Sequence, residues 1–206
     1  MLSAIIAMSI FSFVMSISPG PINLIIVSSG ANYGIKKTMS FVSGATIGFT
    51  LLLMFVGFGF IKIIQAYPIL FNYLSFAGSA FILYIGYKIV SAPSSQIEVK
   101  NDENIPKFYE GFLLQWLNPK AWIAAASGIS MFSSTNNHLL AFIVIYFLIC
   151  YACLSVWAIL GNATTMLLKF NNGLSFFNKG MGLVLIATAC YLIYLQFVNM
   201  RGMMYG

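Results

Sequence analysis

Long apolar runs, interrupted by few charged residues, are the feature that most constrains how this chain can fold. Hydrophobic residues make up 60% of the sequence and charged residues 7%, whereas about a quarter of the residues in a soluble domain carry charge. This composition excludes a water-soluble globule. A membrane-spanning helix uses about 20 mostly apolar residues, so the chain has room for roughly six spans. We therefore expect one integral membrane domain over residues 1–206.

Six apolar segments bounded by polar, glycine or proline positions predict the helices. They cover residues 2–29, 38–61, 69–90, 109–131, 139–160 and 181–199. A membrane β-barrel would instead show strands of about ten residues that alternate apolar and polar side chains. The run over residues 49–56 has no such alternation. The predicted fold is therefore an all-α integral membrane protein with six transmembrane helices.

The acidic residues predict where the chain divides into two halves. All four lie close together in the sequence, at Glu98, Asp102, Glu103 and Glu110. They indicate a hydrophilic linker over residues 91–108, between a first half (1–90) and a second half (109–206) with three spans each. An odd number of spans per half places the second half upside down, which allows an inverted repeat. A shift of 98 residues (119 minus 21) aligns Pro21 with Pro119 in support of this repeat.

Basic residues predict the orientation of the chain. The net charge is +6, but the lysines are scattered between apolar runs, which favours membrane-topology signals over a nucleic-acid surface. The first, third and fifth connections carry seven of them: Lys36, Lys37, Lys88, Lys100, Lys107, Lys169 and Lys179. The opposite side carries two, Lys62 and Arg201. Because cytoplasmic connections carry the excess of basic residues, we expect both termini on the outer face.

The first predicted span contains Ser18-Pro19-Gly20-Pro21. Proline has no backbone N–H and clashes with the carbonyl four residues back, so this stretch should free the carbonyls of Met15 and Ile17. One interpretation is a packed kink. The other is a discontinuous helix whose free carbonyls face a substrate ammonium and whose restarted N-terminus faces a carboxylate.

The fourth predicted span has a similar break at Asn118-Pro119. Asn118 is a good N-cap, Pro119 suits the first helical position, and this proline should free the carbonyl of Gln115. Lys120 follows inside an apolar segment. It either extends to the membrane interface or, as an intramembrane charge, anchors a substrate carboxylate.

Two broken helices at corresponding places in two halves predict a substrate site near the membrane midplane. The candidate substrate-binding residues are Pro19, Gly20, Pro21, Asn23, Gln115, Asn118, Pro119 and Lys120. Ser28 and Ser29 are further polar candidates near the first break, although such a residue alone more often forms a helix-packing hydrogen bond. We expect no catalytic residues and no enzymatic activity.

Small residues recur at four-residue spacing in the second predicted span, at Ser40, Gly44 and Gly48. Such spacing allows helix backbones to approach closely. The interpretation we favour is packing within one chain. The alternative is the contact face of a homodimer.

Cysteine and histidine suggest two other functions. Cys150 and Cys153 form a C-x-x-C pair, as in a thiol-disulfide electron carrier, but a carrier with two inverted halves needs a cysteine in each, and all three cysteines lie in the second half. His138, the one histidine, has no acidic or histidine neighbours in its connection. We therefore expect no metal site and no cofactor.

The motifs together resemble those of the LysE/RhtB family of bacterial amino-acid exporters. The resemblance rests on Ser18-Pro19-Gly20-Pro21, Gly30-x-x-x-Gly34, Gly44-x-x-x-Gly48, Gly111-Phe112 and Asn118-Pro119-Lys120-Ala121. Residues 44–49, 74–80 and 87–89 are most similar to the cysteine/O-acetylserine exporter branch. Many members of the family carry an aspartate at the position of Phe49, and its absence here favours a zwitterionic over a basic substrate.

The resemblance implies a six-helix inner-membrane exporter, driven by the proton motive force. With the two helix breaks, it predicts a secondary transporter that exports small neutral amino acids or derivatives by alternating access, in contact with membrane lipid. The alternatives are an exporter of another solute such as a metal cation, the electron carrier, and a membrane scaffold that transports nothing.

Overall fold

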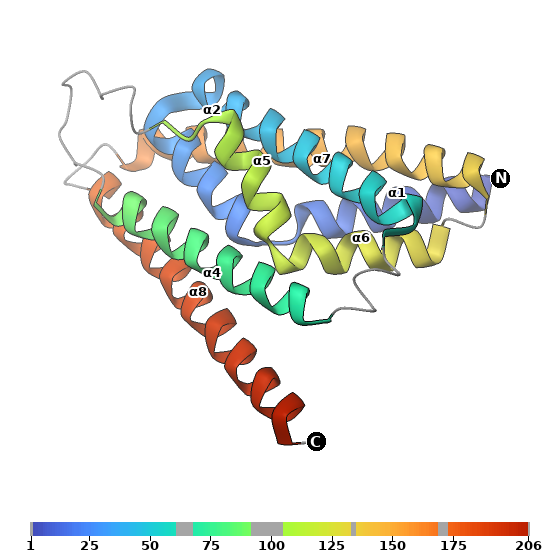
Figure 1. Ribbon diagram of the computed structural model, residues 1–206. Coiled ribbons are helices and arrows are strands. Elements are labelled where there is room, and N and C mark those ends of the chain that lie inside the picture. The colour runs from blue at the N-terminus through green and yellow to red at the C-terminus, as the bar shows by residue number, and fades with distance from the viewer. Residues whose placement is uncertain (1, 61–67, 92–104, 133–134, 169–172, 206) are drawn as a thin grey trace.

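The computed structural model describes residues 2–60, 68–91, 105–132, 135–168 and 173–205, and all elements in this part of the chain are helical (Figure 1). In chain order they are α1 (Leu2–Ile17), α2 (Pro21–Phe55), the π-helical turn η1 (Val56–Phe60), α4 (Pro68–Val90), α5 (Phe108–Leu117), α6 (Pro119–Phe132), α7 (Asn136–Leu168) and α8 (Gly173–Tyr205). The all-α expectation is thus confirmed for these residues.

The first predicted span, 2–29, is interrupted where the prolines predict, because α1 ends at Ile17 and α2 begins at Pro21. The predicted connection between residues 29 and 38 is shorter than expected: two helical arms of α2 meet at a sharp kink at Gly34 (φ 80°, ψ 170°). The chain reverses there, since the hydroxyls of Ser29 and Thr38 lie 2.8 Å apart. Only glycine adopts such a positive φ readily. Thr38 Oγ1 donates to the carbonyl oxygen of Gly34 at 2.9 Å, within the range for O–H donors, and so helps to hold the start of the second arm at this kink.

Two helical stretches, Pro21–Gly59 and Asn136–Thr164, are long and apolar enough by themselves to cross a membrane. Three shorter helical stretches of the described chain are also apolar: Leu2–Ile17, Ser79–Val90 and Phe176–Tyr191. In α7 and α8 the helix extends beyond the predicted spans 139–160 and 181–199 at both ends. The prediction was too short because polar residues at helix ends were assigned to connections.

Several helices of the first half of the chain pack against helices of the second half. α1 lies along α7, and α5 lies against the second arm of α2, after the bend at Gly34 (Figure 1). α4 packs along α8, whose C-terminal end extends away from the other helices (Figure 1). The buried core is built mainly from large apolar side chains, among them Ile26, Phe41, Leu52, Leu114 and Phe142.

The small residues of α2 face α5 of the same chain. A Cβ at Gly44 would overlap the carbonyl oxygen of Phe108, and a Cβ at Gly48 would lie 2.8 Å from the carbonyl oxygen of Phe112. The backbones of α2 and α5 therefore touch, as the interpretation of packing within one chain requires. Ser40, assigned to the same stripe, is instead exposed.

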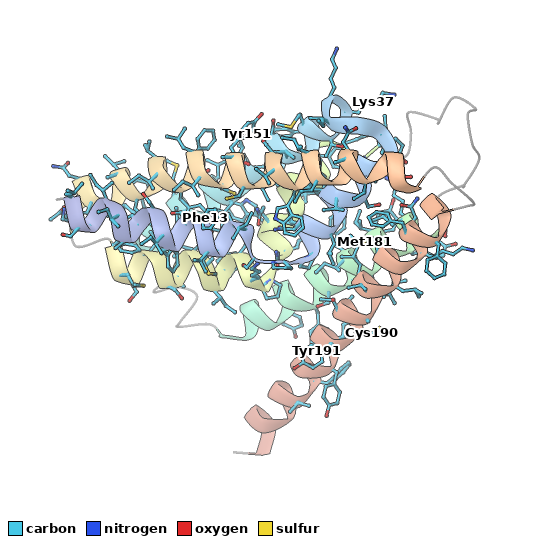
Figure 2. The ribbon with its side chains drawn as sticks, turned by 180° about the vertical axis from the view of Figure 1, so that it is seen from behind. Phe13, Lys37, Tyr151, Met181, Cys190 and Tyr191 are labelled. Atoms are coloured by element: carbon cyan, nitrogen blue, oxygen red, sulfur yellow. The ribbon has the colours of Figure 1, made fainter. Side chains whose placement is uncertain are left out.

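Large apolar side chains also cover the outer faces of the helices. Phe13 is 51% exposed, Leu148 is 60% exposed and Tyr191 is 60% exposed. Figure 2 shows Tyr191 projecting outward from α8 and Lys37 projecting outward from α2. An apolar outer surface of this extent marks a face that contacts lipid or another protein.

The predicted linker, 91–108, lies largely outside the described residues, together with Glu98, Asp102 and Glu103. Its end is one residue shorter than predicted, since α5 begins at Phe108 and Lys107 is its N-cap. Glu110, grouped with the linker acids by the sequence analysis, is buried in the first turn of α5. The helix boundary explains the difference, because an acidic residue three positions after the N-cap can bond the exposed N–H groups there.

Candidate functional site

The break between α1 and α2, partly exposed at Pro19, is held by side chains. The amide of Asn23 donates to the carbonyl oxygens of Ser16 (3.1 Å) and Ser18 (3.2 Å). The carbonyl of Met15, expected to be free, accepts the hydroxyl of Ser18 at 3.1 Å. The proline-rich stretch thus breaks the helix as predicted, and the chain itself satisfies carbonyl groups that the break releases.

Lys120 reaches this break from the other half of the chain. Its ammonium donates to the carbonyl oxygen of Ser18 (2.8 Å), the hydroxyl of Ser18 (2.8 Å) and the carbonyl oxygen of Pro19 (3.3 Å). A cation suits the C-terminal end of a helix, where the helix dipole is negative. The position that the sequence analysis gave to a substrate ammonium is therefore held here by the ammonium of Lys120.

The space for this contact exists because residue 20 is glycine. A Cβ at Gly20 would lie 3.3 Å from Nζ and 3.4 Å from Cδ of Lys120. The backbone of Gly20 is extended (φ −169°, ψ 175°), a conformation open to any residue. The glycine is thus needed for the close approach of Lys120 rather than for an unusual backbone angle.

The second break, between α5 and α6, is organised by Asn118. Its side-chain oxygen accepts the backbone N–H of Lys120 at 3.1 Å, which confirms the predicted N-cap. The carbonyl of Gln115 was predicted to be free, and this prediction was wrong, because the carbonyl accepts a hydrogen bond from the backbone N–H of Asn118 at 3.3 Å. The indole N–H of Trp122 donates to the carbonyl of Trp116 at 2.6 Å, so an aromatic side chain also closes this break.

Two cavities meet at Lys120. The inner cavity, of about 40 Å³, extends from Lys120 toward α1 and α7. The larger cavity, of about 380 Å³, extends from Lys120 toward α8. Gly20, Asn118 and Lys120 line both. Among the described residues, Lys120 is the one charged side chain that lines either cavity.

The structure brings all eight predicted substrate-binding residues to these cavities. Asn23 and Gln115 line the inner cavity only. Pro19, Pro21 and Pro119 line the larger cavity only. The remaining three, Gly20, Asn118 and Lys120, lie at the boundary between the two.

The cavities also contain residues that the sequence analysis did not select. Ser16 from α1 and Tyr146 and Cys150 from α7 line the inner cavity, together with Phe49, whose ring stacks on Tyr146 at 4.3 Å between centroids. Thr188 of α8 lines the larger cavity. Cys150 and Phe49 stood out in the sequence for other reasons, the C-x-x-C pair and the missing aspartate, whereas Ser16, Tyr146 and Thr188 carried no signal because each is a single residue within an apolar helix.

Glu110 and Lys88 form a second buried polar group, away from the breaks. The carboxylate of Glu110 accepts a hydrogen bond from the ammonium of Lys88 at 3.2 Å and another from the backbone N–H of Lys107 at 2.8 Å. The side chain of Glu110 is 6% exposed and that of Lys88 is 22% exposed. The position of Glu110 in the first turn of α5 could have suggested its contact with the N-cap residue Lys107. Its ion pair with Lys88 of α4, however, depends on how the two helices pack.

Polar side chains also connect α2 with α8. Asn32 and Asn178 exchange two amide hydrogen bonds, of 2.6 Å and 2.9 Å. Ser28 donates to Asn178 at 3.4 Å, and the hydroxyls of Ser29 and Thr38 lie 2.8 Å apart. Ser28 and Ser29 therefore act in helix packing, the alternative that the sequence analysis kept open, and neither lines the cavities at Lys120.

Cys150 and Cys153 are buried free thiols, and Cys190 is an exposed one. His138, at the beginning of α7, is partly buried. Within the described ranges, no group of three or more His, Cys, Asp and Glu residues lies close enough to hold a metal ion. The group of residues around Lys120 is thus the best candidate site.

Comparison with known proteins places this chain in a family. The family model described as LysE type translocator matches residues 13–196. The cysteine/O-acetylserine efflux proteins of Escherichia coli (strain K12) and Shigella flexneri serotype 5b (strain 8401) are each 25% identical over 136 residues, which cover 65% of this chain and 68% of theirs. No solved structure matches the chain.

These matches confirm the resemblance to LysE-type exporters and to the cysteine/O-acetylserine branch. They also agree with the two helices of membrane-spanning length and with the amino-acid export class. Since the family model covers nearly all of the sequence, the chain belongs to the LysE type translocator family and is an amino-acid export transporter of the membrane.

Proposed function

We propose that this protein exports small neutral amino acids or derivatives, of the cysteine/O-acetylserine kind, across the bacterial inner membrane by alternating access. The observation that carries the proposal is the contact of Lys120 with Ser18, which joins the two helix breaks at the boundary of two cavities. Broken helices that meet in this way form the substrate sites of many secondary transporters. The names of the curated relatives support the substrate class.

A zwitterion fits between the groups now in contact. Its carboxylate would pair with the ammonium of Lys120 and with the N-terminal ends of α2 and α6, where helix dipoles are positive. Its ammonium would bind the carbonyl oxygens of Ser18 and Pro19, which Lys120 contacts in this structure. Because no acidic side chain lines either cavity in the described chain, a second positive charge on the substrate would have no partner.

Alternating access would use the relationship between the two halves. We propose six spans arranged as two inverted three-helix repeats, in which α1 corresponds to α5, the second arm of α2 to α7, and α4 to α8. The observed packing supports this, because α1 contacts α7 while α5 contacts the second arm of α2. α4 and α8, which would be counterparts, pack on each other.

The proposal also covers orientation, energy source and partners. Both termini would lie on the outer face, as the distribution of lysines predicts. The proton motive force would drive export, and the exposed apolar faces of α1, α7 and α8 would contact lipid. A homodimer would have to use a surface other than Gly44 and Gly48, because these residues contact α5 of the same chain.

The alternatives make different demands on the site. A metal exporter needs acidic or thiolate ligands near the breaks, where the cavities offer Cys150 alone among such groups in the described chain. An electron carrier needs both cysteines of the C-x-x-C pair. A scaffold would not need the helix breaks. We propose transport without enzymatic activity, since the lining residues serve to bind and orient a zwitterion.

Export can be tested by feeding cells a mixture of dipeptides and measuring the amino acids in the medium by mass spectrometry. Cells that express the wild type should release a neutral amino acid, such as cysteine or a serine derivative, which cells with an empty vector do not. A Cys153→Ser variant should release it equally, because Cys153 lies outside both cavities.

Two of the alternatives predict a different effect of these substitutions. If Cys153→Ser abolished whatever function the wild type has in these cells, that result would favour the electron carrier. If Pro19→Ala and Pro119→Ala left the function of the protein in the cells unchanged, that result would favour the scaffold. No enrichment of any amino acid, despite confirmed expression in the membrane, would contradict amino-acid export.

A further inference from the structure

The inner cavity is chemically different from the boundary at Lys120. Its lining includes the hydroxyl of Ser16, the phenol of Tyr146 and the thiol of Cys150, all on buried residues. Apolar side chains, including Ala124 and Leu154, also belong to the lining. Lys120 is thus the one charged side chain among the described residues of this lining, which otherwise offers small polar groups and apolar surface.

Ser16 is the most informative residue of this lining. It is 6% exposed, and its hydroxyl makes no hydrogen bond of ordinary length but lies near the phenol of Tyr146 and the thiol of Cys150. Ser9 and Ser12, earlier in the same helix, each donate to the carbonyl four residues before them, at 2.8 Å and 2.7 Å. Because buried polar groups are nearly always well hydrogen-bonded, three neighbouring polar groups that line a cavity, one of them without a bond of ordinary length, indicate a ligand with a polar atom at that point.

The volume of the cavity limits what can enter. A volume of about 40 Å³ holds a few atoms beyond the boundary, since a single water needs roughly 10–15 Å³ by the same measure. The larger cavity, of about 380 Å³, has room for a whole amino acid. The α-carbon of a substrate would therefore remain near Lys120, and its side chain would point into the inner cavity.

We propose that the inner cavity is the side-chain pocket of this exporter, and that Ser16, with Tyr146 and Cys150, selects a short side chain ending in a hydroxyl or thiol. The inference rests on the proposed export of neutral amino acids and narrows it to cysteine and serine over alanine, O-acetylserine and longer side chains. One extra methylene in a close-fitting pocket changes selectivity by about 10-fold or more.

The size limit is tested by efflux of labelled amino acids from proteoliposomes that contain the full chain. Leu154→Ala should enlarge the pocket and raise methionine efflux relative to cysteine by about tenfold. The control is Leu52→Ala, which removes an equally buried leucine that lines neither cavity. Ala124→Val should reduce cysteine efflux more than Ala125→Val, since Ala125 is buried outside the cavities.

The polar preference is tested with Ser16→Ala. The ratio of serine or cysteine efflux to alanine efflux should fall by about tenfold, because a site built to bond a polar substrate atom rejects an analogue that lacks it. Ser12→Ala is the matched control, as Ser12 is equally buried on the same helix but bonds the backbone. This variant should keep the wild-type ratio.

The outcomes separate this inference from the proposed function. If the reconstituted wild type moves no amino acid, the proposed function fails and the pocket assignment fails with it. If the wild type exports neutral amino acids of every size equally, and Leu154→Ala and Ser16→Ala leave the profile unchanged, the pocket assignment is overturned while export stands. A changed size profile with an unchanged hydroxyl preference would overturn the role of Ser16 alone.

Discussion

The ammonium of Lys120 lies 2.8 Å from the carbonyl oxygen of Ser18, a residue 102 positions earlier in the chain. One end of this contact is the C-terminus of a broken helix, and the other follows the N-cap of a second broken helix. The contact therefore ties the two halves of the molecule together at the point where both are interrupted. A substrate that separates these two residues would change how the halves meet.

Removing the ammonium should impair export. We expect Lys120→Ala to lower amino-acid efflux by about tenfold or more, because the loss of one charged partner at a buried site costs roughly 1.5–3 kcal/mol. Efflux from proteoliposomes measures the effect, with the amount of inserted protein as the control. Unchanged efflux from a well-expressed variant would rule out the role of Lys120 in substrate binding.

Adding a methyl group opposite Lys120 should lower efflux while leaving the stability of the protein nearly unchanged. In Gly20→Ala the new Cβ would press on Nζ at 3.3 Å, while the extended backbone accepts alanine. We expect efflux to fall several-fold, with a change below about 1 kcal/mol in the free energy of unfolding in detergent. Gly180→Ala is the control, since a Cβ there meets nothing within 4 Å. Equal efflux from both variants would contradict the prediction.

The same change at Gly44 should affect stability instead. A Cβ there would overlap the carbonyl oxygen of Phe108, so α2 and α5 would have to separate. Overpacking of this kind costs about 1–3 kcal/mol. Denaturant unfolding in detergent should show this loss for Gly44→Ala, and a stability equal to that of Gly180→Ala would show that the helices do not touch at this point.

The ion pair of Glu110 and Lys88 should stabilise the packing of α5 against α4. Glu110→Gln leaves the ammonium of Lys88 without its charged partner, and breaking a buried pair costs about 3 kcal/mol. The double variant Lys88→Met with Glu110→Gln should recover part of that loss, because it also removes the unpaired charge. Thermal unfolding of the wild type, the two single variants and the double variant measures both effects, and additive losses would contradict the coupling.

The sequence determined those features that depend on neighbouring residues. Pro19, Pro21 and Pro119 break their helices wherever the chain packs, because a proline lacks the N–H that the helix needs. Asn118 caps the following helix for an equally local reason, since its side chain reaches the N–H two residues ahead. The apolar runs likewise fixed the helical membrane class, and the eight candidate residues came from the two breaks alone.

Tertiary structure decided which distant groups meet. Sequence reasoning assigned the carbonyl groups of the first break to a substrate, but packing brings Lys120 to Ser18 and Pro19 instead. It also pairs Glu110 with Lys88 and places Tyr146 of α7 at the inner cavity. No local pattern encodes these contacts, because each depends on the relative position of helices far apart in the chain, and buried polar groups take the partners that this packing supplies.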